Sequence, residues 1–159
     1  MKIYDLIKKY EGCRLKAYPD PATNSVPYTI GWGTTIYPNG EKVKIGDGCT
    51  QKEADFYLDW YCKTQIKLPK GDFTDEQKAA LYSISYNIGG SFELSKCYRY
   101  IEEKKWEQAF AEWNWCRANG QVLKGLVRRR KEERFFFFKN ILDVDFFEKK
   151  YYSKYIALG

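Results

Sequence analysis

Apolar residues near the start of the chain recur with the period of an amphipathic helix. They stand three or four positions apart: Ile3, Leu6, Ile7 and Tyr10. Such positions gather on one face of a helix, and a glycine commonly follows the last helical residue. The pattern predicts a helix over residues 2–11 that ends at Glu11 and is stopped by Gly12.

Residues 14–47 have no helical period and are rich in proline and glycine. This composition is typical of short strands joined by tight turns. We expect strands at residues 28–32 and 41–45. Asn39 followed by Gly40 predicts a hairpin turn just before the second of them.

From residue 50 onward the pattern is helical. Helices over residues 50–66 and 74–88 each begin with a capping box, a threonine followed three residues later by glutamate or glutamine. The two boxes are Thr50 with Glu53 and Thr74 with Gln77. Further predicted helices are residues 91–104, the aromatic stripe from Trp106 to Trp113, residues 123–140, and a helical tail. We expect the stripe to be core, because aromatic residues at helical spacing usually pack.

The order of these elements predicts one α+β domain with two lobes. A small β-containing lobe covers residues 12–49, and a larger helical lobe covers residues 50–159 together with the first helix. At 159 residues the chain is long enough to bury a core without disulfides or metals. A cleft between the lobes is the natural place for an extended ligand.

The composition restricts the chemistry that the chain can carry out. It contains no histidine, which excludes Ser-His-Asp and Cys-His sites, histidine-bearing zinc sites and an imidazole base. Its five cysteines form no CxxC motif, so we expect scattered buried thiols, no metal and no cofactor. The N-terminal residues do not resemble a signal peptide, and no apolar run reaches the roughly 18 residues of a membrane span. We therefore expect synthesis in the cytoplasm without stable membrane insertion.

The net charge of +6 is concentrated in one segment. Residues 117–134 contain seven basic side chains and two acidic ones. A patch of this kind attracts polyanions such as nucleic acid or an anionic wall polymer. We expect residues 128–134 to be mainly a solvated helix face, and the apolar run 135–138 that follows to be buried.

Three polar residues in the first third of the chain can support acid–base chemistry: Glu11, Asp20 and Thr29. Glu11 closes the first helix, where the negative end of the macrodipole favours a neutral carboxyl group. Cleavage of a glycosidic bond needs one protonated carboxyl group and a second carboxylate that stabilises the cation, attacks it or activates water. Spacing alone leaves open that Glu11 is simply solvated and that Asp20 caps a turn.

These residues stand within motifs that resemble the phage-type lysozymes, glycoside hydrolase family 24. Glu11 to Tyr18, then Asp20, then Tyr28 to Gly33 resemble the active-site pattern of that family. The stretches from Ala80 to Ser95 and from Gly120 to Arg134 resemble its cleft-lining helix and its GL..RR..E helix.

The resemblance implies a lysozyme-like fold and hydrolysis of the β-1,4 bond between N-acetylmuramic acid and N-acetylglucosamine in peptidoglycan. It assigns Glu11 as general acid, Asp20 as the carboxylate that activates water or supports the cation, and Thr29 as the residue that holds the water. It also places five residues at the saccharide: Trp32, Thr35, Tyr86, Asn87 and Ser95. Trp32 can equally be a packing residue.

The sequence departs from the family pattern at Thr34, where members often carry a histidine with a structural role. The loop between Asp20 and Thr29 is also longer than in the shorter members. The resemblance further implies inversion at the anomeric carbon, a monomer that binds glycan strands and no nucleic acid, and holin-type delivery to the wall.

Two other functions are compatible with parts of the sequence. A lytic transglycosylase would act on the same substrate but typically uses a single glutamate, which the presence of Asp20 and Thr29 disfavours. A non-catalytic module could bind polyanions through the basic helix, although no nucleic-acid motif accompanies that helix.

Overall fold

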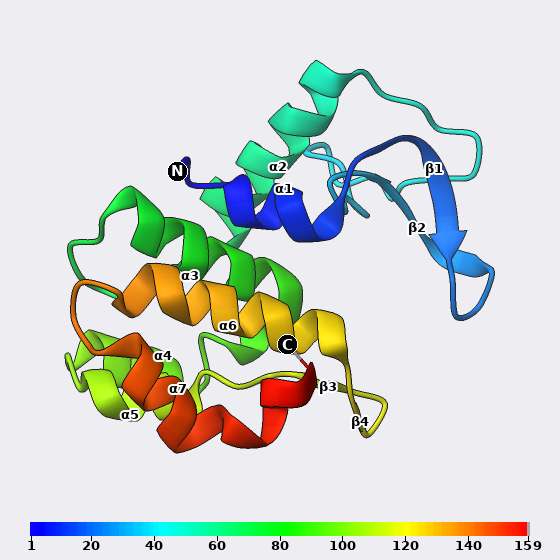
Figure 1. The fold of residues 1–159 in the computed structure, drawn as a ribbon. Helices are drawn as coiled ribbons and strands as arrows, with labels where there is room; N and C mark the ends of the chain where they lie inside the picture. Colours follow the sequence, from blue (N-terminus) through cyan, green and yellow to red (C-terminus); the bar gives the residue numbers. More distant parts are fainter. Residues whose placement is uncertain (159) are drawn as a thin grey trace. The chain divides into compact units, whose positions relative to one another are not determined.

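The computed structural model describes residues 1–158. Helices and two small antiparallel sheets make up the fold, which confirms the predicted α+β class (Figure 1). The chain forms two compact units. One runs from Ile7 to Lys67, and the other combines Met1–Leu6 with the chain from Leu68 onward.

The unit from Ile7 to Lys67 contains most of helix α1, a β-hairpin and a second helix. Their bounds are α1 Asp5–Glu11, β1 Arg14–Asp20, β2 Ser25–Gly31 and α2 Gln51–Gln65. The two strands pair antiparallel with Arg14 opposite Gly31, Tyr18 opposite Thr29 and Asp20 opposite Ser25. The register shifts between these pairs, so the hairpin is irregular.

A tight turn follows β2 and packs closely against α2. Ile30 and Thr34 exchange backbone hydrogen bonds of 2.9 and 2.8 Å, which closes the turn Gly31-Trp32-Gly33. Gly31 has a φ of 63°, and a Cβ at this position would lie 3.1 Å from the Ala54 Cβ of α2. Glycine therefore meets both the backbone conformation and the space available.

The strand predicted at residues 41–45 is absent, although the turn that should precede it is present. The Gly40 amide donates to the Tyr37 carbonyl, and the Tyr37 amide donates to the Glu41 carbonyl, each over 2.9 Å. Beyond the isolated bridge between Ile36 and Lys42, the chain turns again instead of extending. The Asp47 side chain accepts a hydrogen bond from the Lys44 amide, and the Asp47 amide donates to the Lys44 carbonyl, which together fix this second turn.

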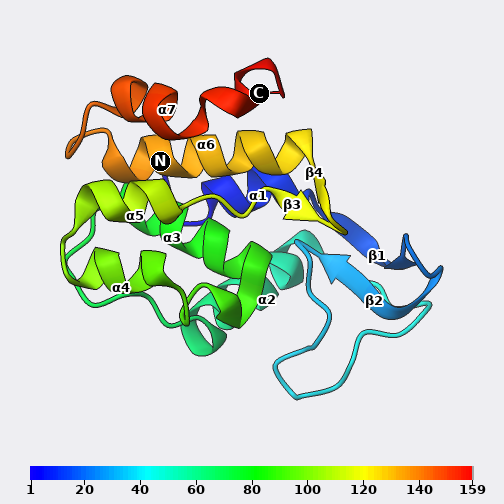
Figure 2. The same cartoon turned by 90° about the horizontal axis from the view of Figure 1, so that it is seen from below.

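The second unit is mainly helical. Its elements are α3 Asp75–Ile88, η1 Gly89–Ser91, α4 Lys96–Glu102, α5 Trp106–Glu112, β3 Arg117–Ala118, β4 Gln121–Val122, α6 Lys124–Phe138, α7 Val144–Tyr152 and η2 Ser153–Leu158. Helices α3 and α6 run side by side in both views (Figures 1 and 2). Both predicted capping boxes are present, at Thr50 before α2 and at Thr74 before α3.

The helix predicted to begin at Ser91 begins later. Residues 89–91 form a short 3-10 turn, and α4 starts at Lys96 after Ser95. The Ser95 side chain caps α4 by accepting a hydrogen bond from the Tyr98 amide at 3.1 Å. Because a serine in an extended conformation satisfies the free amides of the first turn, the helix begins at this cap.

Aromatic side chains form the core of the second unit. Within the predicted stripe, Ala109, Phe110 and Trp113 are fully buried, which confirms their core position, whereas Trp106 is half-buried. The run from Phe135 to Phe138 behaves differently from the prediction: Phe137 and Phe138 are buried, whereas Phe135 is 46% exposed. Four consecutive residues cover every side of a helix, and one side of α6 faces solvent at this point.

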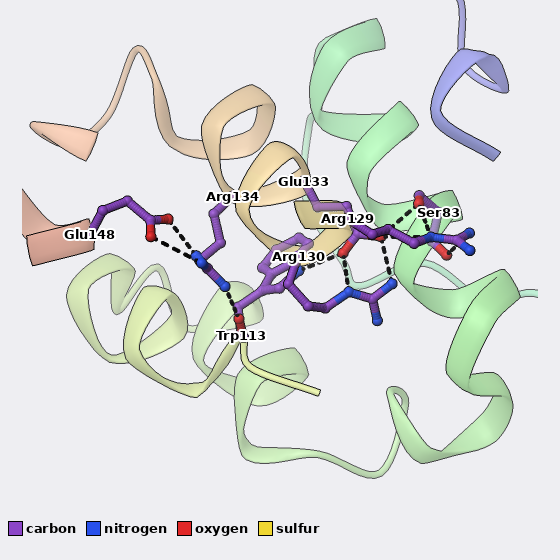
Figure 3. Close-up of polar contacts among 7 residues, drawn as sticks. All are labelled: Ser83, Trp113, Arg129, Arg130, Glu133, Arg134 and Glu148. Atoms are coloured by element: carbon purple, nitrogen blue, oxygen red, sulfur yellow. Dashed lines mark hydrogen bonds and ion pairs between the residues drawn. The ribbon is translucent and has the colours of Figure 1, made fainter. Parts of the chain in front are cut away.

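The basic segment of α6 is only partly solvated, which corrects the expectation for residues 128–134. Arg129, Arg130 and Arg134 are at most 4% exposed, and Glu133 is completely buried. Figure 3 shows that Glu133 lies at the centre of a polar cluster that joins α6 to α3 and to the end of α5.

Glu133 accepts hydrogen bonds from groups on three sides. The Ser83 hydroxyl lies 2.6 Å and the Trp113 indole nitrogen 3.0 Å from its carboxylate oxygens, and Arg130 contacts the carboxylate at 2.8 and 2.9 Å. Arg129 donates to both the hydroxyl and the carbonyl of Ser83. Carboxylate and carbonyl oxygens thus replace part of the water that these buried cations would otherwise bind.

Arg134 extends the cluster toward the C-terminal helices (Figure 3). It donates to both carboxylate oxygens of Glu148 in α7, at 2.6 and 3.0 Å, and to the Trp113 carbonyl at 2.7 Å. Its guanidinium also lies 3.7 Å from the ring centroid of Tyr152. One arginine therefore joins α6, α7 and the end of α5.

All five cysteines are free thiols. Three are buried as expected, Cys62, Cys97 and Cys116, whereas Cys13 and Cys49 are half-buried. Burial raises the pKa of Cys62 to about 12, so this thiol stays neutral. Among residues 1–158, no helix is long and apolar enough to cross a membrane.

Candidate active site

Glu11 is the last residue of α1, as the hydrophobic pattern predicts. The helix ends because Gly12 follows with a φ of 68°, and the Gly12 amide donates to the Lys8 carbonyl at 3.3 Å. This left-handed glycine is a common helix ending. Glu11 itself is half-buried, so its carboxyl group is neither fully solvated nor sealed in the core.

Asp20 ends strand β1, and one of its carboxylate oxygens has a structural role. Oδ1 accepts a hydrogen bond from the Ala22 amide at 2.8 Å, while the Asp20 carbonyl accepts from the amides of Thr23 and Asn24. This is the turn-capping arrangement that the sequence left open. Within residues 1–158 no group donates to Oδ2, so the second oxygen can face a substrate or a water molecule.

Thr29 lies on β2, opposite the segment of chain that runs from Glu11 to Asp20. It pairs with Tyr18, two residues before Asp20, and Gly31 pairs with Arg14, three residues after Glu11. The hairpin thus brings Thr29 next to the strand that connects the acids. All three residues are half-buried and belong to the same compact unit.

Trp32 is fixed by polar contacts from two helices. Its indole nitrogen donates to Oδ1 of Asp55 in α2 at 2.7 Å, and the Lys8 ammonium of α1 lies 5.2 Å from its ring centroid. Lys8 and Asp55 also form an ion pair at 3.2 Å. The tryptophan therefore packs between the helices, and its use as a sugar platform remains a prediction.

The cluster of Lys8, Trp32 and Asp55 braces the helix that ends in Glu11. Lys8 lies one turn before Glu11 on α1, and Asp55 fastens it to α2. Neither Lys8 nor Asp55 is evident as a site residue from the sequence. The available signal is spacing alone, because Lys8 and Glu11 stand three residues apart on a helix, where side chains are neighbours.

The Asp55 cluster should make this unit sensitive to acid. The Trp32 hydrogen bond, followed by the Lys8 contacts, lowers the pKa of Asp55 below its ordinary value. A lowered pKa contributes stability above the unfolded-state pKa, and this stability is lost as the pH falls through the folded-state pKa. We expect Asp55→Asn to cost about 0.5–1 kcal/mol at neutral pH, a small value because the side chain is partly exposed.

Urea unfolding at pH 7 and at pH 3 measures this contribution. The difference in stability between the wild type and Asp55→Asn should shrink at the lower pH, because the carboxyl group of the unfolded chain is already largely protonated there and the advantage of the folded carboxylate is being lost. Asp59→Asn is the matched control, because Asp59 lies one turn along α2 and pairs with the exposed Lys63. An Asp55→Asn penalty that is equal at both pH values would contradict the assignment.

Thr34 and Thr35 follow the turn of Trp32. Thr34, at the position of the family histidine, is 8% exposed, and its backbone closes the turn with Ile30. Thr35 is half-buried, and its carbonyl accepts a hydrogen bond from the Val43 amide at 2.9 Å. The backbones of both threonines thus shape the loop.

The remaining saccharide candidates lie in the second unit. Tyr86 is half-buried and Asn87 exposed, both near the end of α3. The Ser95 hydroxyl donates to the Phe92 carbonyl at 2.6 Å and caps α4, so its visible role is structural. Contact of these three residues with sugar remains a prediction.

The described part of the chain contains no group of three or more histidine, cysteine, aspartate or glutamate side chains that could hold a metal ion. The three candidate catalytic residues offer carboxyl and hydroxyl groups. A helix-end glutamate, a strand-end aspartate with one unbonded oxygen and a threonine on the paired strand can transfer a proton and orient water.

Comparison with known proteins identifies the family of this chain. A family model described as phage lysozyme matches residues 8–133. The endolysin of Bacillus phage PZA is 35% identical over 139 residues, which are 84% of this chain and 52% of that protein. The endolysin of Acyrthosiphon pisum secondary endosymbiont phage 1 is 34% identical over 145 residues, covering 83% of this chain and 92% of that protein.

A solved structure agrees with these matches. The endolysin from Escherichia coli O157:H7 phage FAHEc1 has a TM-score of 0.67 and 27% identity, and the match covers 89% of this chain and 96% of that one. The chain belongs to the phage lysozyme family. It spans about half the length of the Bacillus phage relative.

Proposed function

We propose that this protein is an endolysin muramidase that hydrolyses the β-1,4 bond between N-acetylmuramic acid and N-acetylglucosamine in bacterial peptidoglycan. One observation carries the proposal. In a member of the phage lysozyme family, Glu11, Asp20 and Thr29 belong to one compact unit, with Thr29 on the strand that pairs with the strand ending in Asp20. Lysis of the host follows from cleavage of its wall after release of the enzyme, for which we propose holin-type delivery.

The site residues divide the reaction between them. Glu11 donates its proton to the glycosidic oxygen, which leaves as the hydroxyl group of the departing sugar. Oδ2 of Asp20 activates the attacking water or supports the developing oxocarbenium ion, while Oδ1 stays bound to the Ala22 amide. The Thr29 hydroxyl positions the water, whose oxygen bonds to the anomeric carbon. The proton that the water loses returns to Glu11, so that Glu11 is again protonated and Asp20 again ionised, and one water molecule is consumed per bond.

Analysis of the products tests the reaction class. Purified peptidoglycan digested with the wild type should release fragments whose new reducing ends are converted to sugar alcohols by borohydride. Products with a 1,6-anhydro end, which borohydride leaves unchanged, would show a lytic transglycosylase instead. Asp20→Asn should lose most of the activity while its circular dichroism spectrum is unchanged.

The alternative of a basic polyanion-binding module is weakened by burial. Three of the seven basic side chains in residues 117–134, those of Arg129, Arg130 and Arg134, are used inside the protein. Four exposed ones remain: Arg117, Lys124, Arg128 and Lys131.

A further inference from the structure

A pocket lies in the unit that holds Glu11 and Asp20. Its volume is about 420 Å³, which is in the range of small-ligand sites. The side chains that matter for its chemistry are Tyr37, Glu41, Lys42, Lys44, Asp47 and Tyr57. The proposed catalytic roles use none of them.

Two tyrosines and one aspartate shape the pocket. The rings of Tyr37 and Tyr57 meet edge to face with centroids 5.2 Å apart. The Tyr37 hydroxyl donates to Oδ2 of Asp47 at 2.8 Å, and the Lys44 amide donates to the same oxygen at 2.9 Å. The carboxylate of Asp47 is therefore engaged in holding the loop together, and the tyrosine rings provide a fixed wall.

The remaining charges face solvent at this pocket. Lys42 and Lys44 are exposed, and in the described structure neither ammonium group pairs with a carboxylate within 4 Å. Glu41 is also exposed beside them. The pocket therefore has two cations and two anions around an aromatic wall. Asp47 is held by the Tyr37 and Lys44 hydrogen bonds, which leaves Lys42, Lys44 and Glu41 available to a ligand. This combination suits a short peptide that carries several carboxylates and an amino group, whereas muramic acid without its peptide offers a single lactyl carboxylate and no amino group.

Backbone hydrogen bonds connect the pocket to the strand that ends in Asp20. The Ala17 amide donates to the Asp47 carbonyl at 2.9 Å, and Lys16 forms a β-bridge with Gly48, which also lines the pocket. Asp20 lies three residues beyond Ala17, about 10 Å along an extended strand. A substituent attached to a sugar next to the scissile bond can span this distance when it is several residues long.

We propose that this pocket binds the peptide side chains that peptidoglycan carries on its muramic acid residues. Lys42 and Lys44 pair with the peptide carboxylates, Glu41 pairs with a free amino group, and Tyr37 and Tyr57 pack against the peptide backbone. The inference rests on the proposed function, since it names a further part of the same substrate. Peptide binding adds affinity for glycan that bears peptides and leaves the chemistry at Glu11 unchanged.

The kinetic test compares peptidoglycan strands with and without peptides, the latter prepared with an N-acetylmuramoyl-L-alanine amidase. We expect the wild-type kcat/KM to be about fivefold higher on the strands with peptides, which is what two solvent-exposed ion pairs contribute together. The preference should fall at high ionic strength. In the variant Lys42→Ala/Lys44→Ala it should approach one, with the rate on peptide-free strands unchanged.

Lys52→Ala is the matched control, because Lys52 is an exposed lysine of α2 in the same unit and does not line the pocket. It should keep the wild-type preference. A double variant that keeps the full preference would overturn the proposal, as would a wild type that cleaves both strands equally well.

A binding experiment separates this inference from the proposed function. The synthetic peptide L-alanyl-γ-D-glutamyl-L-lysine, added to labelled protein, should shift the amide resonances of residues 37–48 in the wild type and in Lys52→Ala, but not in the double variant. If the wild type cleaves neither type of strand while these shifts appear, the muramidase proposal fails and the peptide site stands. Cleavage without such shifts at millimolar peptide refutes the pocket alone.

Discussion

Replacing Glu11 by glutamine is expected to reduce the rate of wall clearing by about 10²–10⁴-fold, the usual contribution of a general acid. The amide has nearly the same shape as the carboxyl group but has no acidic proton to give to the glycosidic oxygen. Because Glu11 is half-buried at the end of α1, the substitution should leave the helix and the neighbouring cluster of Lys8, Trp32 and Asp55 in place. Loss of turbidity in chloroform-treated Gram-negative cells measures the rate.

The matched control for this variant is Glu103→Gln, since Glu103 is a surface residue of the other unit that pairs with Arg99 and Lys105. It should clear cells at the wild-type rate. A thermal unfolding curve of Glu11→Gln that matches the wild type excludes a general loss of structure. Clearing at a near-normal rate by Glu11→Gln would remove this residue from the mechanism.

Truncation of Glu133 to alanine is expected to lower the free energy of unfolding by about 3–5 kcal/mol, as found when one partner of a buried ion pair is removed. The cause is the charge left behind. Arg130 is completely buried and contacts the Glu133 carboxylate at 2.8 Å, so its guanidinium would lose its counter-ion. Ser83 and Trp113 would also lose their acceptor. Urea unfolding followed by circular dichroism measures the change.

The size of this effect depends on burial, and a surface pair provides the comparison. Glu103→Ala removes contacts to Arg99 and Lys105, whose side chains are more than half exposed. This substitution should cost at most about 1 kcal/mol. Removing both buried charges with Arg130→Met and Glu133→Leu should cost less than Glu133→Ala alone, because no unpaired charge remains. If the double substitution is the more damaging one, charge pairing is not the source of the stability.

Local signals in the sequence predict most helix starts of this fold. Thr50 and Thr74 specify where α2 and α3 begin, since a capping box satisfies free amides within four residues of chain. The start of α4 was placed too early because Ser91 and Ser95 are both possible caps. The structure uses Ser95, whose hydroxyl also bonds the Phe92 carbonyl. That choice depends on how the buried Phe92 packs, which lies outside the local sequence.

Burial of charge was the main feature that the sequence did not predict. Arg129 and Arg130 stand four and three residues before Glu133, a spacing that permits ion pairs on any helix, exposed or buried. Only the packing of α6 against α3 shows which of the two cases applies. The same limit affected the site, where Glu11 and Asp20 follow from motifs, but the contact between Lys8 and Asp55 depends on how two helices meet.

The turn between β1 and β2 has a consequence for how this family can diversify. The Asp20 carboxylate is held by the Ala22 amide, and Thr29 is held by its pairing with Tyr18. Residues 23–27 contact Asp20 only through their backbone, and their exposed side chains hold neither reacting group. Loop extensions add little entropic cost. Related lysozymes can therefore lengthen or shorten this stretch, and so vary what surrounds the substrate, while the reacting groups stay in register.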